Sequence, residues 1–206
     1  VVVEQTGRAL LPGPFVPTVI ASTALLTAGD DAVRSRLLPG LADGSVTAAV
    51  ALDGDVTVSG GTASGSVGTA VGAGVADLLV VPVGDDLVVV TLRDAGPASD
   101  PVAGVSIEVP ENLDPSRRSG RVTLDSAPVE VVAGGARALV DAARLLFAAE
   151  AVGIARECTE QAADFRARID AHREAIGRTG DFSMMVSLND AVTVDQFRRA
   201  TDVGVT

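Results

Sequence analysis

Residues 64–81 read SGSVGTAVGAGVADLLVV, a glycine-rich segment that runs directly into an apolar one. Residues 72–77, GAGVAD, come one residue short of the GxGxxG fingerprint of dinucleotide-binding proteins. That fingerprint must follow a strand and open a helix, because the pyrophosphate binds at the helix N-terminus. Here the glycines precede residues 78–83, an apolar β-branched run typical of a strand. We therefore interpret the stretch as a flexible connection within a β domain.

Strand-forming runs continue on both sides of this stretch. They are short, rich in β-branched residues and separated by Gly, Asp and Pro. Gly84, Asp85 and Asp86, between two valine-rich runs, predict a tight hairpin turn. Six or seven strands at intervals of about ten residues predict an antiparallel sandwich or barrel. The predicted strands are 46–52, 55–58, 77–83, 86–92, 105–109 and 121–124.

Helical patterns precede the strands. A helix over 2–11 must stop at Pro12, because proline removes a backbone donor and clashes with the preceding turn. A second helix is predicted over 18–27 with Pro17 in its first turn, and a third over 32–41 with Asp30 or Asp31 as its cap.

Another helical pattern follows the strands. From Ala136 to about Ala175 there is no proline and one glycine, which predicts a helix of the length found in bundles and oligomer interfaces. A weaker helical pattern covers 187–200. The fold class is therefore α+β, with an N-terminal helical domain over 1–44, a middle β domain over 45–133 and a C-terminal helical domain over 134–206.

Composition narrows the partners and the compartment. The formal net charge of −11 argues against nucleic-acid binding and against docking on anionic membranes. No run of about 20 apolar residues could cross a membrane, and the first residues carry no basic leader. The single cysteine, Cys158, fits a reducing cytoplasm. Because the chain begins within a helical pattern and without Met, we expect it to be a partial chain.

Several residues are candidates for chemistry, each with a structural alternative. His172, the only histidine, and Cys158 have no partners in register, and Ser-His-Asp and metal-ligand spacings are absent. Glu150 interrupts an apolar run, where a carboxylate forms an ion pair more often than it serves as a catalytic base. Arg117 and Arg118 could bind an anion or simply face solvent.

Ordered segments of the chain resemble the acyl-CoA dehydrogenase family. Residues 7–17, GRALLPGPFVP, and 28–52 are similar to the family's helices leading into its β domain. Residues 113–132, LDPSRRSGRVTLDSAPVEVV, are similar to the closing strands of that domain, and 147–165, FAAEAVGIARECTEQAADF, to the first long helix of the C-terminal bundle. The resemblance covers about residues 1–178. It is closest to divergent actinobacterial members that act on steroid or other bulky acyl-CoA thioesters.

This resemblance implies a helix–β–helix subunit that assembles into a tetramer. FAD and acyl-CoA would be held between domains and across subunits, and the reaction would be α,β-dehydrogenation of the thioester. The family's flavin-side triplet, Trp-Ile-Thr or similar, falls on Thr69, Ala70 and Val71, so the aromatic residue is missing. The position of the base in some members falls near Ala143, which cannot accept a proton. No catalytic residue and no metal ligand is therefore assigned.

One further motif concerns the FAD pyrophosphate. The family sequence Arg-Glu-x-Phe-Gly-Arg-Pro-Ile has its counterpart in residues 173–178, REAIGR, in which Arg173 and Gly177 are retained. A guanidinium can bind phosphate through two parallel hydrogen bonds. The predicted cofactor-binding residues are thus Thr69, Val71, Arg173 and Gly177, and the predicted cofactor is FAD, held by this chain or shared with a partner subunit.

Three functional hypotheses follow. The first is a partner subunit of a heteromeric acyl-CoA dehydrogenase, in which a homologous chain supplies the base. The second is a self-sufficient homo-oligomeric dehydrogenase, represented here by an incomplete chain. The third is a structural or binding protein of the same descent that holds no flavin, so enzymatic activity itself stays open. The acyl group, the partner and the electron acceptor are not encoded in recognisable motifs.

Overall fold

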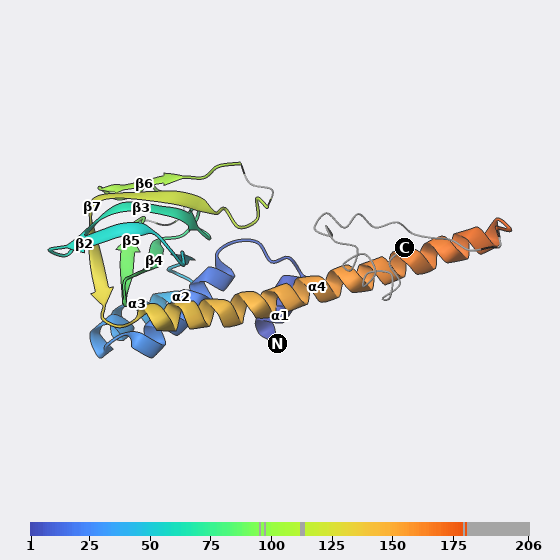
Figure 1. Ribbon diagram of the computed structural model, residues 1–206, viewed down its shortest axis with the longest axis horizontal. Helices are drawn as coiled ribbons and strands as arrows, with labels where there is room; N and C mark the ends of the chain where they lie inside the picture. Colours follow the sequence, from blue (N-terminus) through green and yellow to red (C-terminus); the bar gives the residue numbers. More distant parts are fainter. Residues whose placement is uncertain (95, 97, 112–113, 179, 181–206) are drawn as a thin grey trace, which may run out of the picture. The chain divides into compact units, whose positions relative to one another are not determined.

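The computed structural model describes residues 1–94, 96, 98–111, 114–178 and 180 (Figure 1). They belong to two compact units, Val1–Cys158 and Thr159–Thr206. The elements in chain order are α1 (Val2–Arg8), α2 (Phe15–Ala28), α3 (Asp31–Asp43), β1 (Ala48–Val50), β2 (Asp55–Ser59), β3 (Thr62–Ala70), β4 (Leu78–Val83), β5 (Asp86–Thr91), β6 (Val105–Glu108), β7 (Gly120–Val132) and α4 (Ala136–Ala175). The order of helices, strands and a long helix confirms the predicted α+β class.

The strands form one curled sheet in the first unit, with the order β1-β4-β5-β7-β3-β2 (Figure 1). The 13-residue strand β7 joins the two halves of the sheet. The first part of β7 pairs with β3 and β6, and its last part pairs with β5. All pairs are antiparallel except β1 and β4, which run parallel. The prediction of an antiparallel β domain therefore needs this correction, and the chain between β1 and β4 contains the hairpin β2–β3.

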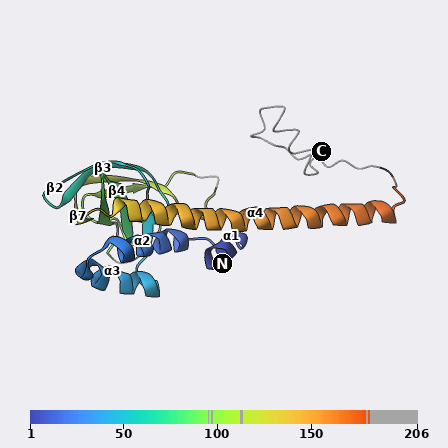
Figure 2. The same cartoon turned by 60° about the horizontal axis from the view of Figure 1, so that its bottom comes forward.

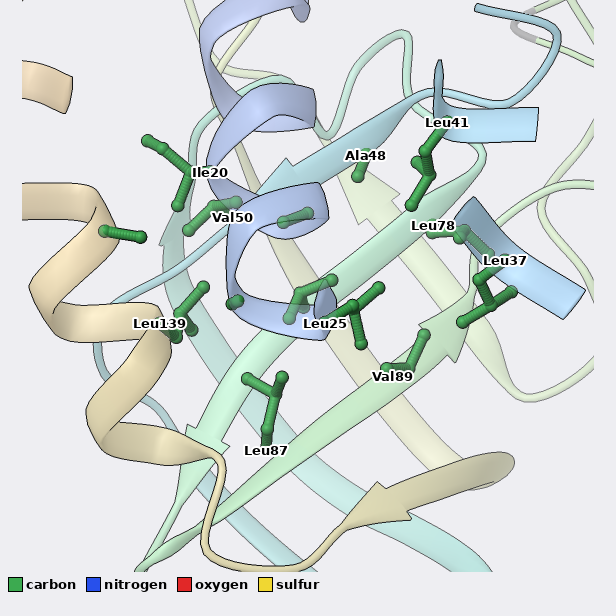
Figure 3. Close-up of a cluster of buried hydrophobic side chains, with 14 of the residues drawn as sticks. Ile20, Leu25, Leu37, Leu41, Ala48, Val50, Leu78, Leu87, Val89 and Leu139 are labelled. Atoms are coloured by element: carbon green, nitrogen blue, oxygen red, sulfur yellow. The ribbon is translucent and has the colours of Figure 1, made fainter. Parts of the chain in front are cut away.

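The apolar runs of β4 and β5 are continuous because both faces of these strands are buried. Leu79 and Val81 point into a core between the two halves of the curled sheet. Leu78 and Val80 point the other way, toward the helices. Figure 2 shows α2 and α3 on that side of the sheet, and Figure 3 shows their side chains in contact with the strands. The largest members of this helix-side core are Ile20, Leu25, Leu37, Leu41, Leu78, Leu87 and Leu139.

The first part of the glycine-rich stretch forms strand β3, and its interpretation as a flexible connection was wrong for these residues. Glycine, serine and alanine are poor strand formers, and tertiary pairing overrides that weakness. β3 lies between β2 and β7, with hydrogen bonds on both edges. Gly65 has a φ of +137°, and a Cβ there would lie 2.0 Å from the Asp55 carbonyl oxygen. A glycine at this position is thus what lets β2 approach β3.

The helices begin and end close to the predicted positions. Asp30 caps α3, because its Oδ1 accepts a hydrogen bond from the Val33 N–H at 2.9 Å. α2 contains no charged residue, which suits a helix packed on the sheet. α4 runs without interruption over 40 residues, as predicted. The predicted helix over 187–200 lies outside the described residues. None of the helices in the described ranges is long and apolar enough to cross a membrane.

Candidate functional site

The segment with the predicted site residues Thr69 and Val71 leads from β3 into a single helical turn. The Val71 N–H donates to the Val50 carbonyl at 2.8 Å, and the Val71 carbonyl accepts from the Val50 N–H at 3.1 Å. The N–H groups of Val75 and Ala76 then both donate to the Gly72 carbonyl at 3.0 Å, which closes the turn. Thr69 is exposed and Val71 is half-buried. The segment is thus fixed at Val71 by its pairing with the end of β1, and the closed turn follows directly after it.

Asp77 ends the turn and joins it to β1. Its carboxylate Oδ2 accepts hydrogen bonds from the Thr47 N–H at 2.8 Å and from the Thr47 hydroxyl at 3.0 Å. Its backbone carbonyl accepts from the N–H groups of Leu92 and Arg93. Asp77 is buried, and its Oδ1 has no hydrogen-bond partner among the residues that the structure describes. The residue therefore ties together the starts of β1 and β4 and the end of β5.

Arg93 follows β5 and is buried, with 8% of its surface exposed. Its Nη1 donates to the carbonyls of Ala73 at 3.0 Å and Ala76 at 2.7 Å. These carbonyls belong to the helical turn after β3. Neither Asp77 nor Arg93 was predicted as a site residue. The available signal was a charge directly beside an apolar strand, which must be paired or hydrogen-bonded when it is buried.

The loop 114–118 contacts the turn from another side. The Gly74 N–H donates to the Arg118 carbonyl at 2.9 Å, and the Gly13 N–H donates to the Ser116 carbonyl at 3.0 Å. The pKa of Asp114 lies below its usual value, because its carboxylate accepts hydrogen bonds from the Ser116 hydroxyl, which has the larger effect, and from the Ser116 N–H. The loop thereby connects the turn with the segment between α1 and α2, while the Arg118 side chain is exposed.

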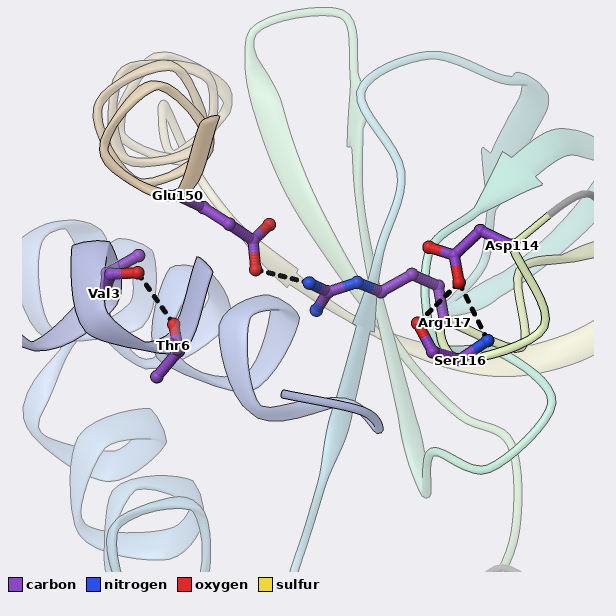
Figure 4. A network of polar contacts seen from close by, with 6 residues as sticks. All are labelled: Val3, Thr6, Asp114, Ser116, Arg117 and Glu150. Carbon is purple, nitrogen blue, oxygen red and sulfur yellow. Dashed lines mark hydrogen bonds and ion pairs between the residues drawn. The ribbon is translucent and has the colours of Figure 1, made fainter. Parts of the chain in front are cut away.

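Arg117 reaches from this loop to Glu150 on α4, and the two side chains form an ion pair (Figure 4). The exposed fractions of the two side chains are 15% and 10%, so the charges are largely removed from water. This contact confirms the ion-pair interpretation of Glu150. It also links α4 to the β domain through a loop that holds the helical turn.

Helix α1 crosses α4 at two glycines. A Cβ on Gly153 would lie 1.9 Å from the Glu4 carbonyl oxygen, and one on Gly7 would lie 2.2 Å from the Glu150 carbonyl oxygen. On either side of the crossing, Arg8 pairs with Glu157 at 3.0 Å and Arg156 with Glu4 at 3.6 Å. This backbone contact places α1 against the part of α4 that carries Glu150.

An apolar pocket of about 540 Å³ lies in the first unit between α2 and the end of α3. Its hydroxyl groups are engaged locally: Ser22 donates to the Thr18 carbonyl and Thr23 to the Val19 carbonyl. The Thr18 hydroxyl oxygen accepts from the Ala48 N–H. The pocket can therefore hold an apolar group but contains no evident chemistry. Its lining residues are Pro12, Pro14, Phe15, Thr18, Val19, Ser22, Thr23, Leu41, Ala42, Asp43, Gly44 and Thr47.

The predicted residues Arg173 and Gly177 belong to the second unit. Arg173 lies in the last turn of α4, and its Nη2 donates to the Gly180 carbonyl at 3.1 Å. Gly177 has a φ of +69°, a conformation that suits glycine just after a helix. His172 and Cys158 are exposed on α4. Within the described ranges, no group of three or more His, Cys, Asp or Glu could hold a metal ion.

Two curated proteins of Mycobacterium tuberculosis are similar to this chain. It is 36% identical over 157 residues to the acyl-CoA dehydrogenase FadE34, which covers 75% of this chain and 20% of the relative. It is 30% identical over 165 residues to the acyl-CoA dehydrogenase IpdE2, which covers 80% of this chain and 42% of the relative. The chain belongs to the acyl-CoA dehydrogenase family. No family model matches it. It spans less than half the length of each of these two relatives.

Several solved structures share its fold. The ChsE4–ChsE5 complex of Mycobacterium tuberculosis gives a TM-score of 0.66 at 21% identity, over 79% of this chain and 48% of that chain. Glutaryl-coenzyme A dehydrogenase in complex with glutaryl-CoA gives 0.61 at 20% identity, over 79% and 49%. Butyryl-CoA dehydrogenase from Megasphaera elsdenii gives 0.59 at 17% identity, over 79% and 50%.

The residues that the sequence predicts to face the flavin fit a flavin only in part. Thr69 is exposed, and a Cβ on the neighbouring Gly68 would meet no atom within 4 Å, so the surface beside Thr69 is open. The Thr69 hydroxyl could donate a hydrogen bond to a ring edge. Val71 has both backbone groups bonded to Val50 and could offer only its side chain. The triplet 69–71 contains no aromatic ring that could stack on a flavin.

Proposed function

We propose that this chain is a subunit of a flavin-dependent acyl-CoA dehydrogenase that introduces an α,β double bond into an acyl-CoA thioester. Within that enzyme it would be the subunit without the catalytic base. The observation that carries the proposal is that α4 offers no available base near the expected position. Ala143, near the expected position of the base, is fully buried, and Glu150 is committed to Arg117.

Glu150 is a poor base for two physical reasons. A general base must come within hydrogen-bond reach of the proton that it removes, whereas Glu150 has 7% of its surface exposed. Protonating or moving its carboxylate would also leave the charge of Arg117 buried without a partner, which is strongly unfavourable. A homologous chain that carries an unpaired acidic residue would therefore supply the base.

FAD would be the cofactor and would accept the hydride from the acyl group. From this chain, Thr69 and Val71 would face the ring, and Arg173 would bind the pyrophosphate next to Gly177. Arg173 lies near a helix end, and its planar guanidinium matches phosphate geometry. Because the aromatic residue is missing, we propose that a partner subunit completes the flavin site.

The partner would be a second acyl-CoA dehydrogenase chain in a tetramer, and the substrate a bulky acyl-CoA, such as a steroid derivative. The structural similarity to a complex of two proteins, ChsE4 and ChsE5, supports the heteromeric arrangement. The similarity to a glutaryl-CoA complex supports the thioester.

Co-expression with genomic neighbours tests the proposal. We expect the chain to purify with a homologous partner and the complex to contain FAD. Arg173→Ala should then lower FAD retention by about tenfold, the usual effect of losing a charge-assisted hydrogen bond of about 1.5 kcal/mol. Arg144→Ala, which removes an exposed arginine of α4, is the control. Unchanged retention in Arg173→Ala would exclude the phosphate contact.

A self-sufficient homo-oligomer is the second candidate. It is favoured by the small part of the relatives' length that this chain covers. The chain matches only 20% and 42% of them, so a base could reside in sequence that this chain does not contain. The discriminating observation is the intact reading frame. A further helical region of about 150 residues with a suitably placed Glu or Asp, enough for a full bundle, would favour this candidate.

A structural or binding protein without flavin is the third candidate. The absence of an aromatic residue from Thr69, Ala70 and Val71 favours it. Colourless complexes after co-expression with every neighbouring gene would support this candidate over the other two.

A further inference from the structure

We propose that Arg93 is a positioning residue whose buried guanidinium fixes the helical turn 72–76 and, through it, the segment 69–71. The inference rests on the proposed function in one respect only, the assignment of that segment to the flavin side. The positioning itself depends on contacts within this chain.

The guanidinium occupies the carbonyl end of the turn. The N–H groups of Val75 and Ala76 point back to the Gly72 carbonyl, so the carbonyls of Ala73 and Ala76 are left without partners from the turn itself. One nitrogen of Arg93, Nη1, donates to both, at 3.0 and 2.7 Å. A cation at the carbonyl end of a helical turn is favourable, because the partial negative charges gather there.

Burial makes this contact strong. Ala73 and Ala76 are fully buried, so water cannot replace a lost donor at these carbonyls. Arg93 forms no ion pair with any residue that the structure describes, and its Nε has no hydrogen-bond partner there. The hydrogen bonds that the structure gives its guanidinium go to the two carbonyls of the turn. Removing it leaves two buried acceptors unsatisfied.

The turn passes this restraint to the residues before it. Its other backbone contacts include the Gly74 N–H on the Arg118 carbonyl, the Ala73 N–H on the Ala70 carbonyl, and the paired backbones of Val71 and Val50. The backbone of Arg93 is itself fixed, because its N–H donates to the Asp77 carbonyl at 3.1 Å. Arg93 therefore connects the carbonyl end of the turn with the backbone of Asp77 and the end of β5.

Hydrogen–deuterium exchange of the full chain, with its partner if one co-purifies, tests the positioning without using activity. We expect Arg93→Met to speed exchange of the Val71, Gly74 and Ala76 amides by about tenfold or more, the effect of losing a charge-assisted hydrogen bond. Arg93→Lys should keep most of the protection, because one ammonium can also donate to both carbonyls. Arg137→Met, at an exposed arginine of α4, is the control.

The same variants, each in complex with the co-expressed partner, are then titrated with FAD. The proposal predicts weaker FAD binding in Arg93→Met by about tenfold and near-normal binding in Arg93→Lys. Unchanged exchange at the three amides, or equal acceleration in α2, would refute the positioning. Faster exchange with unchanged FAD affinity would refute the link to the flavin. If the complex of the unaltered protein with its co-expressed partner binds no FAD, the proposed function fails, whereas the exchange result still decides what Arg93 does.

If Arg93→Met does not fold, the decision falls to Arg93→Lys and Arg93→Gln. Gln keeps a single donor group without the charge, so exchange at the turn should be faster in Arg93→Gln than in Arg93→Lys. Equal exchange in the Lys and Gln variants and the unaltered protein would overturn the proposal.

Discussion

Replacing Glu150 by alanine tests whether the ion pair with Arg117 anchors α4 to the β domain. Both side chains are at most 15% exposed, so the substitution leaves a guanidinium charge largely buried without a partner. Breaking such a pair costs about 3–5 kcal/mol, and the remaining exposure places the expected loss near the lower limit, about 3 kcal/mol. For a chain of this size, that loss lowers Tm by roughly 6–12 °C.

The assay is urea unfolding of Glu150→Ala followed by circular dichroism, with the slope m as a check that the same surface unfolds. Arg117→Met combined with Glu150→Leu removes both charges and fills the space with apolar atoms, so stability should return close to the starting value. Asp141→Ala, which breaks an exposed pair with Arg137 on α4, should cost only about 0.5 kcal/mol.

A loss below about 1 kcal/mol in Glu150→Ala would refute the reasoning. It would mean that Arg117 is solvated without its partner and that the carboxylate of Glu150 is available for other contacts. The argument that excludes Glu150 as a catalytic base would then fail as well.

Three further predictions concern other parts of the first unit. Gly65→Ala should destabilise the chain by more than about 2 kcal/mol in urea unfolding, because its Cβ would lie 2.0 Å from the Asp55 carbonyl oxygen. In the control Gly68→Ala, the new Cβ meets no atom within 4 Å, so the free energy of unfolding should hardly change. Gly153→Ala should separate α1 from α4, since its Cβ would lie 1.9 Å from the Glu4 carbonyl oxygen; exchange of the α1 amides should rise, and unchanged protection would contradict the observed crossing. Ser116→Ala should raise the pKa of Asp114, because it removes the hydroxyl whose hydrogen bond does most to stabilise the charged form, while the N–H at position 116 remains. The stabilisation is present above the carboxyl's ordinary pKa and is lost as pH falls through the lowered folded pKa, which NMR titration of Asp114 in the two proteins would show.

The sequence predicted elements better than it predicted contacts. α4 was found with its observed bounds, because a long stretch without proline has few alternatives. The hairpin at Gly84 and Asp85 followed from turn chemistry, and the structure confirms it in the pairing of Val83 with Asp86. β3 was missed, because small residues carry no strand signal and only its two neighbouring strands make it a strand. The parallel pairing of β1 with β4 depends on topology that local patterns do not contain.

The same limit applies to the candidate site. The position of Glu150 in an apolar run predicted an ion pair, but Arg117 as its partner lies 33 residues away and could only be identified in three dimensions. Asp77 and Arg93 are charges beside buried strands, and sequence alone did not separate them from solvated charges. Their roles come from the buried carbonyls and amides that they contact. The assignments of Thr69, Val71, Arg173 and Gly177 to FAD stay predictions.

The most direct test of the proposed function is to purify the chain alone and with its co-expressed homologous neighbour, and to measure flavin content and acyl-CoA oxidation in both. We predict that the chain alone holds little FAD and oxidises no acyl-CoA, and that the complex contains FAD and is active. Substituting the acidic base of the partner should abolish that activity. Stoichiometric FAD and acyl-CoA oxidation by the purified chain alone would contradict the proposal that it is the subunit without the base.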